Sequence, residues 1–477
     1  MRRTKIVATL GPATDELDVL IEIFQAGLDV ARLNFSHGTQ QDHLRRLELL
    51  REATRRTGRY VAILGDLSGP KIRIESFVTG AVQLVEGQPF ALDTALDKNA
   101  GNQREVGVAY KELVVDVAAG DTLLLNDGLI VLEVLSVQGT RIETRVVAGG
   151  ELSNRKGVNR KGGGISAPAL TDKDREDIVF AAAQGIDYVA LSFVRDAEDL
   201  HQARALLRAA GGNFTRLVAK IERHEAVAQL AGIIDATDVV MVARGDLGVE
   251  MGHAALTGLQ KTIIHETRMR NRIVITATQM MESMIQNPVP TRAEVSDVAN
   301  AVLDGTDAVM LSAETATGKY PVKAVAAMAE VIQGAETYHL SQSRPRERSD
   351  ITFTQSEEAI AHAVMYTANH LDVRAIVALT ESGATTLWMS RLRSDIPIYA
   401  FTRHEATRRR VTLYRGVYPV SFDVQPDDNV PLPQRVFDML LDLRIVDEGD
   451  QIILTKGELS GVQGGTNSMQ ILRVHRA

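Results

Sequence analysis

Three charged side chains stand near the ends of two apolar runs. Lys220 and Glu222 close the run that begins at Arg216, and Asp246 follows the run at residues 239–243. Side chains two residues apart on a strand share a face, so Lys220 and Glu222 are expected to point the same way. An ammonium beside two carboxylates suits a divalent metal and a phosphoryl group together. For an isolated Lys-x-Glu a salt bridge would be the simpler interpretation, but here the same layout recurs along the chain.

Short β-branched runs that end in polar residues return eight times. Most are continuously apolar, as strands buried on both faces should be, and stretches with helical spacing separate most of them. This pattern predicts an α/β protein built on a (β/α)₈ TIM barrel, whose chemistry is assembled at the C-terminal ends of the strands. The runs are residues 5–9, 29–33, 61–65, 188–193, 217–221, 239–243, 273–277 and 308–312.

One connection in this pattern is far too long for a simple loop. About 120 residues separate the third and fourth runs, and connections of that length are uncommon. Within them, two apolar runs flank Asp127-Gly128, a strong hairpin signal. We therefore expect a small all-β lid domain at residues 70–167, inserted into a barrel domain made of residues 1–69 and 168–342.

A further domain is predicted after the barrel. Residues 341–350 are polar and charged and are typical of a linker. Strand-like runs at 375–379, 396–401, 416–422 and 451–454 then alternate with helical stretches. That order predicts a C-terminal, doubly wound α/β domain at residues 343–477.

The composition excludes several classes of protein. The chain has 477 residues, 45% hydrophobic and 24% charged, with a net charge of -8 and a pI near 5.8. This balance argues against bulk electrostatic binding to nucleic acid or an anionic membrane. There is no cysteine, which excludes disulfides and thiolate chemistry. No apolar stretch at the N-terminus is long enough for a signal peptide or a membrane span, so we expect a cytoplasmic protein.

Other runs also end in groups that could do chemistry. After the second run, Arg32, Asn34 and Ser36 would alternate onto one face if the extended form continues past Leu33. Arginine suits a phosphate or carboxylate, and the neutral oxygens of the other two suit a monovalent cation. Turn and N-cap formation is the alternative, and for this motif alone it is favoured. Comparable groups follow the third, seventh and eighth runs, namely Asp66, Lys71, Arg73, Thr278 and Glu314.

Long ordered segments of the chain resemble the pyruvate kinase family. They include RLNFSHG at 32–38, MVARGDLGVE at 241–250 and ITATQMMESMI at 275–285, and the resemblance extends over essentially the whole chain. The family combines a barrel, a β lid inserted after its third strand and a C-terminal α/β domain, in agreement with the pattern above. The resemblance implies phosphoryl transfer from phosphoenolpyruvate to ADP, giving pyruvate and ATP in the last step of glycolysis. It also implies a homotetramer.

The resemblance assigns roles to residues at matching positions. Glu222 and Asp246 would hold the essential Mg²⁺, with Mn²⁺ as a substitute, and orient the substrate. Lys220 and Arg32 would stabilise the migrating phosphoryl group. The backbone of Gly245, beside Asp246, would contact the substrate carboxylate.

Four further positions match the family. Thr278 corresponds to the hydroxyl implicated in protonating the enolate. The pKa of a hydroxyl is too high for a good general acid near neutrality, so a water relay is expected. Arg73 would assist phosphoryl transfer from the lid hinge. Nucleotide contacts would come from His37, Arg73 and Lys156.

The chain departs from the family at the monovalent-cation site. Many members bind K⁺ through the positions of Asn34, Ser36, Asp66 and a threonine, which here is Leu67. They also carry a glutamate where this chain has Lys71. We expect the Lys71 ammonium to replace the cation, so that K⁺ is not required. The alternative is that the backbone carbonyl of Leu67 still binds K⁺.

A second, regulatory site is expected in the C-terminal domain. Thr380, Ser382, Gly383 and Thr385 leave a strand and open a helix, where backbone N–H groups and hydroxyls can bind an anion. Ordinary helix capping is the alternative. In the family this segment and the Gly-rich loop at 456–466 belong to the effector site, which implies a sugar phosphate or AMP as effector.

Two other functions remain open at this stage. A Mg²⁺-dependent aldolase acting on 2-oxo acids would share Glu222 and Asp246, but it has no need of Lys220, Thr278 and a nucleotide lid together. A catalytically silent binding protein would tolerate loss of the charged strand-end residues, and these are all present.

Overall fold

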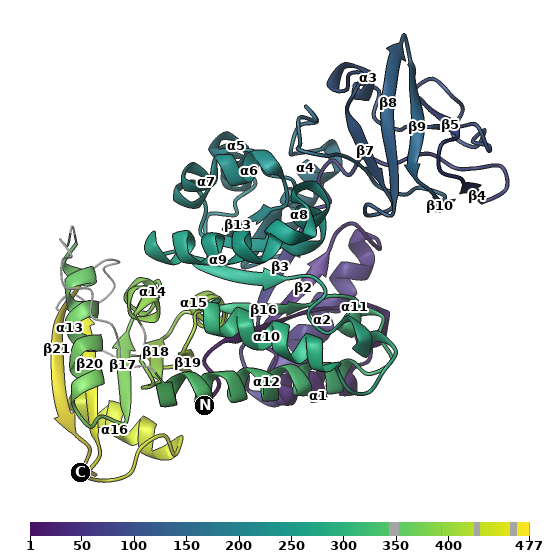
Figure 1. Ribbon diagram of the computed structural model, residues 1–477. Coiled ribbons are helices and arrows are strands. Elements are labelled where there is room, and N and C mark those ends of the chain that lie inside the picture. The colour runs from purple at the N-terminus through teal and green to yellow at the C-terminus, as the bar shows by residue number, and fades with distance from the viewer. Residues whose placement is uncertain (343–352, 354, 393, 424–429, 458–464, 477) are drawn as a thin grey trace. The chain divides into compact units, whose positions relative to one another are not determined.

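The computed structural model describes residues 1–342, 353, 355–392, 394–423, 430–457 and 465–476 (Figure 1). The chain divides into two compact units. One consists of Met1–Gly65, Gly185–Tyr188 and Thr267–Ala477, and the other of Asp66–Gln184 and Val189–Glu266. Within the described ranges, no helix is both long and apolar enough to cross a membrane.

The predicted eight-stranded barrel is confirmed. The strands close in the order β1-β2-β3-β12-β13-β14-β15-β16, and the neighbouring pairs with defined register are parallel. Almost every residue of these strands is buried, which explains why they appear in the sequence as continuous apolar runs. Their bounds are β1 Lys5–Thr9, β2 Val30–Asn34, β3 Ala62–Asp66, β12 Tyr188–Leu191, β13 Arg216–Ile221, β14 Val239–Ala243, β15 Ile273–Ala277 and β16 Ala308–Leu311.

An aspartate repeats at the N-terminal end of every second barrel strand. Asp29, Asp187, Asp238 and Asp307 directly precede β2, β12, β14 and β16. Each carboxylate accepts a hydrogen bond of 2.8–2.9 Å from a backbone N–H of the preceding barrel strand. The N–H of the same aspartate donates to the carbonyl of that same residue. This two-way contact fixes the register of the strand pairs β1–β2, β3–β12, β13–β14 and β15–β16 at their starts.

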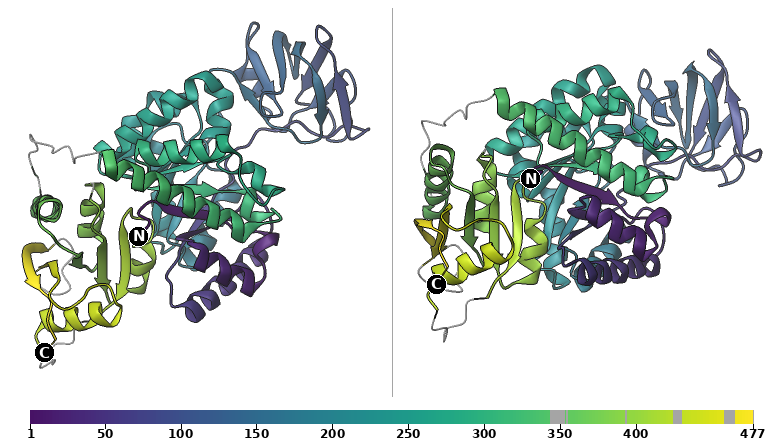
Figure 2. Two further views of the ribbon diagram at one scale, coloured as in Figure 1. Left: turned by 60° about the horizontal axis from the view of Figure 1, so that its bottom comes forward. Right: turned by 90° about the horizontal axis from the view of Figure 1, so that it is seen from below.

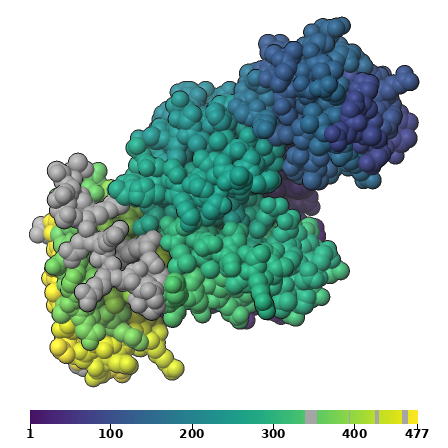
Figure 3. Space-filling view, viewed as in Figure 1, coloured from purple at the N-terminus to yellow at the C-terminus, as the bar shows by residue number. Residues whose placement is uncertain are grey.

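Helices follow most of the barrel strands, and three of them begin with a capping box. In α2, α4 and α10 a threonine accepts from the N–H of an acidic residue three positions on, whose carboxylate accepts from the threonine N–H. Helices α10 and α12 pack together and form part of the surface seen in Figure 3. The helices are α1 Leu17–Ala26, α2 Gln40–Thr57, α4 Asp172–Ala183, α5 Ala197–Ala209, α6 His224–Ala228, α7 Leu230–Ala236, α8 Arg244–Met251, α9 His253–Met269, α10 Arg292–Asp304, α11 Ala313–Ala316 and α12 Pro321–Gln342.

The long insert forms a β structure with its own apolar core. Its larger sheet has the order β11-β7-β8-β9-β5-β6, and β10 pairs with β4. The predicted hairpin is confirmed, because β7 pairs antiparallel with β8 and left-handed backbone at Asn126, Asp127 and Gly128 makes the turn. The elements are β4 Ala81–Leu84, β5 Pro89–Asp93, β6 Glu105–Gly107, one short helix α3 Leu113–Asp116, β7 Thr122–Leu125, β8 Ile130–Gln138, β9 Arg141–Ala148, β10 Gly150–Ser153 and β11 Val158–Arg160.

The C-terminal part contains the predicted α/β sheet, in the order β19-β18-β17-β20-β21. The first four strands are parallel, and β21 adds an antiparallel edge strand that was not predicted (Figure 2). The expected linker begins too early, because α12 continues to Gln342, and residues 343–350 lie outside the described residues. The elements are α13 Ser356–His370, β17 Ala375–Leu379, α14 Ala384–Arg391, β18 Ile398–Thr402, α15 Glu405–Val411, β19 Val417–Ser421, α16 Leu432–Asp442, β20 Gln451–Gly457 and β21 Thr466–Arg473.

Candidate active site

The ammonium group of Lys220, in β13, lies among three oxygen-bearing side chains. Its Nζ is 2.9 Å from Glu222 Oε1 and 3.4 Å from Asp66 Oδ1. It also donates a hydrogen bond of 2.7 Å to Ser192 Oγ. A lysine ammonium has three N–H donors and no acceptor. Lys220 is therefore held in place by acceptors from the ends of β3, β12 and β13.

Glu222 follows β13 directly and is 2% exposed. Its Oε2 accepts a hydrogen bond of 2.7 Å from the backbone N–H of Phe193. Burial raises the pKa of Glu222, and the Asp246 carboxylate raises it further, whereas Lys220 opposes the shift. The expectation that Lys220 and Glu222 lie on the same side is confirmed by their contact.

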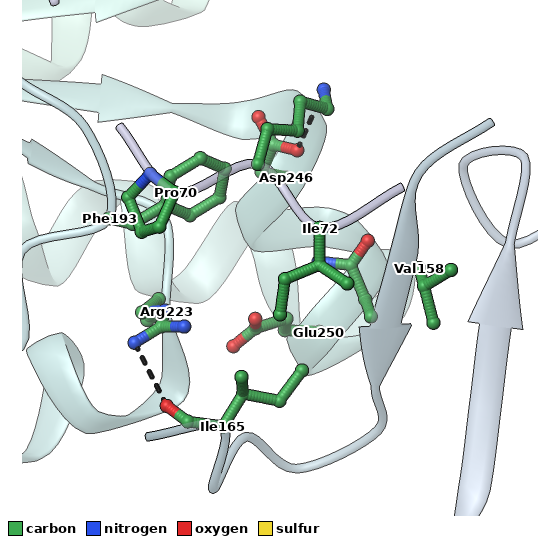
Figure 4. Close-up of a pocket in the computed structure, with 10 residues that line it drawn as sticks. Pro70, Ile72, Val158, Ile165, Phe193, Arg223, Asp246 and Glu250 are labelled. Atoms are coloured by element: carbon green, nitrogen blue, oxygen red, sulfur yellow. Dashed lines mark hydrogen bonds and ion pairs between the residues drawn. The ribbon is translucent and has the colours of Figure 1, made fainter. Parts of the chain in front are cut away.

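Asp246 follows β14, as the sequence suggested, but it lies in a helix. Helix α8 begins at Arg244, so Asp246 and Gly245 both lie in its first turn. A carboxylate in the first turn is favoured by the helix dipole. The Nζ of Lys71 lies 3.7 Å from Asp246 Oδ1 (Figure 4). The structure thus places the Lys71 ammonium beside a predicted Mg²⁺ ligand.

Ser192 and Phe193 were not among the predicted site residues, although they close the fourth apolar run. Ser192 is 2% exposed, and its hydroxyl donates to the carbonyl of Leu67 at 2.8 Å. That carbonyl, which is the alternative K⁺ ligand, therefore already has one hydrogen-bond partner. Phe193 has a φ of 56°, which is a genuine outlier for a bulky residue. The signal available in the sequence was their place at a strand end, where the other candidates stand.

A pocket next to these residues is lined by both the insert and the barrel. Its walls include Asp246, Phe193, Arg223 and Glu250, together with Ile165 from the end of the insert (Figure 4). Arg223 donates to the carbonyl of Ile165 at 3.3 Å. Burial raises the pKa of Glu250 to about 7, against the hydrogen bond that it accepts from the His224 N–H.

A second contact joins the insert to the barrel next to this pocket. The carboxylate of Glu225 accepts a hydrogen bond from the N–H of Gly164. This contact and that of Arg223 both lie within the unit that contains Lys220. The end of the insert is therefore attached directly to the segment that follows Glu222.

Two predicted nucleotide contacts also lie in the insert. Arg73 is exposed, and its guanidinium donates to the carbonyl of Arg155 at 2.8 Å. The backbone carbonyl of Lys156 accepts from the N–H of Ile74 at 2.9 Å, and its side chain is half-buried. The pairing of these two segments brings the positions of Arg73 and Lys156 close together in the insert.

The residues after β2 lie in the other unit, and their expected alternation is wrong. Strand β2 ends at Asn34, whose Oδ1 accepts from the N–H of Ser36 at 3.1 Å. This side-chain turn ends the extended form, so Ser36 does not follow Arg32 along a strand face. Arg32 is buried and donates to Thr9 Oγ1 at 2.9 Å, whereas His37 is exposed.

Thr278, also in that unit, follows β15 in strained backbone. Its φ is 68°, and that of Gln279 is 52°. A β-branched residue in the left-handed region is a genuine outlier, and such strain concentrates at functional sites. Glu314, in contrast, is buried, and both its oxygens accept backbone N–H bonds, from Met281 and Ser312. Its interpretation as a turn residue is the better one.

The predicted effector residues surround the start of α14. Gly383 is the N-cap residue, with a φ of 84°, and its N–H donates to Thr380 Oγ1 at 2.9 Å. The hydroxyl of Ser382 accepts from the Ala384 N–H at 3.4 Å. Thr385 is 3% exposed, and its hydroxyl lies 2.6 Å from that of Thr466. The hydroxyls of Thr380 and Ser382 thus accept from backbone N–H groups at the start of α14, whereas that of Thr385 contacts β21. Most of the second predicted effector segment, residues 458–464, lies outside the described residues.

Two family models match the chain. The pyruvate kinase barrel domain matches residues 1–325, and the pyruvate kinase alpha/beta domain matches residues 358–472. The chain belongs to the pyruvate kinase family. Pyruvate kinase II of Salmonella typhimurium is 54% identical over 99% of both chains. The pyruvate kinase of Buchnera aphidicola subsp. Acyrthosiphon pisum is 49% identical over 99% of both. That of Geobacillus stearothermophilus is 44% identical over 98% of this chain and 80% of its own length.

Pyruvate kinases are phosphotransferases that use Mg²⁺, and the carboxylates found here fit that ion. The Asp246 carboxylate is close enough to Glu222 to raise the pKa of Glu222. A divalent cation relieves this repulsion. Mg²⁺ is usually held by one or two carboxylates together with substrate phosphates and water, not by an all-protein cage. Among the described residues no group of three or more His, Asp or Glu forms a larger metal cluster.

Proposed function

We propose that this pyruvate kinase family member transfers the phosphoryl group of phosphoenolpyruvate to ADP at the site around Lys220. The P–O bond to the enol oxygen breaks, a P–O bond to the β-phosphate of ADP forms, and the enolate takes up a proton at carbon to give pyruvate. The observation that carries the proposal is the Lys220 ammonium, held by Ser192 and two carboxylates. A fixed positive charge is what a migrating phosphoryl group requires.

Within this site each residue has a distinct task. Lys220 stabilises negative charge on the phosphoryl oxygens during transfer. Glu222 and Asp246 would hold Mg²⁺, which neutralises charge and orients the substrate when bound. The first turn of α8, which contains Gly245, presents backbone N–H groups that suit the substrate carboxylate.

Further residues are proposed for the same reaction. Arg32 would share the phosphoryl charge with Lys220, and Thr278 would deliver the proton to the enolate through water. Arg32 lies within β2 and Thr278 directly follows β15, both strands of the closed barrel, and barrel enzymes keep their chemistry at the C-terminal ends of such strands. The strained backbone of Thr278 supports a functional role. His37, Arg73 and Lys156 would contact the nucleotide, and Mn²⁺ would substitute for Mg²⁺.

The same site is proposed to work without K⁺. The Lys71 ammonium lies 3.7 Å from Asp246 and supplies a fixed positive charge there. The Leu67 side chain offers no oxygen, and its carbonyl accepts from Ser192. Asn34 Oδ1 is likewise engaged, by the Ser36 N–H. The Lys71–Asp246 contact and the lack of a side-chain oxygen at Leu67 support the replacement of the monovalent cation by Lys71.

Regulation and assembly are proposed on the family pattern. A sugar monophosphate or AMP would bind at the start of α14, near Thr380, Ser382 and Gly383, and activate the enzyme. Free backbone N–H groups at a helix start favour an anion. A homotetramer in the cytoplasm is the expected assembly and location.

A coupled assay of ATP formation tests the reaction. The wild-type chain is mixed with phosphoenolpyruvate, ADP and Mg²⁺, and Lys220→Met is compared with it. Loss of one charge that stabilises the transition state lowers kcat by about 10²- to 10³-fold. Lys173→Met is the matched control, because Lys173 is an exposed lysine of the same unit, paired with Asp177 on α4. It should retain wild-type activity.

A second assay in the same samples addresses the alternative activity. The release of pyruvate from a 4-hydroxy-2-oxo acid with Mg²⁺, in the absence of nucleotide, reports an aldolase. ATP formation without such release supports the proposal. A wild-type chain that forms no ATP with Mg²⁺ present contradicts it.

A further inference from the structure

Two consecutive residues after β12 contact both charged groups at the centre of the site. Ser192 Oγ accepts a hydrogen bond from Lys220 Nζ at 2.7 Å. The backbone N–H of the next residue, Phe193, donates to Glu222 Oε2, also at 2.7 Å. One short turn therefore contacts the ammonium and the carboxylate that stand two positions apart at the end of β13.

The backbone of this turn has an unusual conformation. Phe193 has a φ of 56°, in a region that L-residues with large side chains rarely adopt. Rotation about its N–Cα bond sets the direction of the following chain relative to the Phe193 N–H. An extended residue here would send the chain beyond Phe193 onward in the direction of β12 instead of into a turn. Such conformations persist only where the surroundings enforce them, and they concentrate at functional sites.

The surroundings of Ser192 enforce the turn from the β3 side. The hydroxyl of Ser192 donates to the Leu67 carbonyl at 2.8 Å, and the Leu67 N–H donates to the carbonyl of Ala190 at 3.0 Å. Gly69 lies against the same residue, since a Cβ at Gly69 would be 2.7 Å from Ser192 Cβ. Both side chains of the turn are buried, with Ser192 at 2% and Phe193 at 7% exposure.

Phe193 is held from the other side. The guanidinium of Arg223, the residue after Glu222, lies 5.8 Å from the centroid of the Phe193 ring. Arg223 is itself anchored to the carbonyl of Ile165. The ring is thereby fixed by the same chain segment that carries the carboxylate.

The direction of the Ser192 hydrogen bonds follows from their partners. A carbonyl oxygen only accepts and an ammonium only donates. Ser192 has one hydroxyl proton, which goes to Leu67, so it turns a lone pair towards Lys220. The hydroxyl cannot reverse this direction without losing both bonds, and Lys220 is held at a fixed position.

We propose that Ser192 and Phe193 form a positioning element that sets Lys220 and Glu222 for phosphoryl transfer. The inference rests on the proposed roles of these two residues. Neither Ser192 nor Phe193 needs to touch the substrate for this task. Misplacing a catalytic group by about 1 Å can lower the rate by about 100-fold, which gives the scale of the expected effect.

Steady-state kinetics of Ser192→Ala and Ser192→Thr test the proposal. Ser192→Ala should lower kcat by about 10- to 100-fold, with a change in KM for phosphoenolpyruvate of about threefold or less. Ser192→Thr keeps the hydroxyl and should recover most of kcat. Thr144→Val is the matched control, because Thr144 is 1% exposed and its hydroxyl donates to the Phe90 carbonyl inside the insert. It should keep the wild-type kcat.

A double-mutant cycle covers the case in which the threonine variant does not fold. Ser192→Ala is combined with Lys220→Arg, and the effect of Ser192→Ala on kcat is measured in both backgrounds. If Ser192 acts through Lys220, its removal changes kcat by no more than about twofold in the arginine background. Equal loss of kcat in both backgrounds overturns the proposal, as does a Ser192→Ala enzyme with wild-type kcat.

The outcomes also separate this inference from the proposed function. A Lys220→Met chain with wild-type activity would overturn the role of Lys220 itself. An inactive Lys220→Met chain beside a fully active Ser192→Ala chain would leave that role intact and overturn only the positioning element.

Discussion

The guanidinium of Arg391 forms two hydrogen bonds to the carboxylate of Asp307, at 2.7 and 2.8 Å. Both side chains are at most 3% exposed. Arg391 ends α14 in the C-terminal α/β part, and Asp307 precedes barrel strand β16. The same carboxylate accepts from the N–H of Val274 at the start of β15. One buried ion pair thus connects the helix after the predicted effector loop to the strand that leads to Thr278.

Breaking this pair should strongly destabilise the protein. Arg391→Met leaves the Asp307 charge buried without its cation, which typically costs about 3–5 kcal/mol. Arg55→Met is the control, because Arg55 forms an exposed pair with Glu52, and exposed pairs contribute about 0–1 kcal/mol. Urea unfolding followed by intrinsic fluorescence measures both. Equal shifts of the unfolding midpoint in the two variants would contradict this reasoning.

Activity should be independent of K⁺ in the wild-type chain. With total salt constant, replacing a large inert cation by K⁺ should leave kcat unchanged, because Lys71 already supplies the positive charge beside Asp246. The double variant Leu67→Thr/Lys71→Glu should become K⁺-dependent, with a rate increase of about tenfold or more, the equivalent of about 1.4 kcal/mol. Leu67→Thr alone serves as the control, and its kcat should stay independent of K⁺. A strong K⁺ activation of the wild-type enzyme would exclude the replacement.

Stability should depend on the protonation of Lys5 at alkaline pH. Burial lowers the pKa of Lys5 to about 8, although the Asp29 carboxylate opposes this shift. Between pH 8 and the unfolded value near 10.5 the folded chain holds fewer protons than the unfolded chain, so this contribution to stability rises with pH. Below pH 8 the buried ammonium costs the folded state about 3 kcal/mol. The pKa of Tyr418, whose ring lies under Lys5, is raised by burial and stays out of this range.

Melting temperatures of the wild type and Lys5→Met between pH 7 and 10 check this dependence. As the pH rises through 8, the melting temperature of the wild type should increase by a few degrees relative to that of Lys5→Met. Lys173→Met, at an exposed lysine, should show a constant difference from the wild type. A constant difference for Lys5→Met as well would show that the buried amine does not titrate in this interval.

Loosening the end of the insert should weaken nucleotide binding. Glu225 accepts from the Gly164 N–H and ties the insert to the barrel segment that contains Glu222. Glu225→Ala should raise KM for ADP several-fold, because a less ordered lid must be fixed when the nucleotide binds. KM for phosphoenolpyruvate should change less. Glu176→Ala, at an exposed position on α4, is the control. Identical KM values for ADP in the two variants would show that the Glu225–Gly164 contact does not contribute to nucleotide binding.

A negative charge at the start of α14 should abolish activation by a phosphorylated effector. Ser382→Asp places a carboxylate beside the backbone N–H groups that would bind phosphate. Hexose monophosphates, pentose monophosphates and AMP are titrated separately at subsaturating phosphoenolpyruvate. The wild type should be activated and Ser382→Asp should not, with equal rates in the absence of effector. Activation that survives in Ser382→Asp would place the effector elsewhere.

The strands of the barrel could be predicted because their environment is uniform. A strand buried on both faces carries a continuous apolar run, and β14 and β15 have the predicted bounds. The Asp127-Gly128 hairpin has a similarly local cause, since its turn requires left-handed backbone. Strand β21 was missed because it is an edge strand whose residues alternate irregularly in burial. Ser36 was misplaced because its N–H donates to the Asn34 side chain and forms a turn directly after β2, so the extended form does not continue.

The sequence by itself determined the chemistry available to this protein. Lys220 and Glu222 are two residues apart, and backbone geometry alone makes them neighbours. Only the tertiary structure decided what surrounds them. Asp66, Ser192 and Lys71 reach the site from other segments, through strand pairing and the path of the insert. Such distant contacts depend on register and barrel closure, which no local pattern fixes, so the residues that hold Lys220 and Glu222 in place appear only in the folded chain.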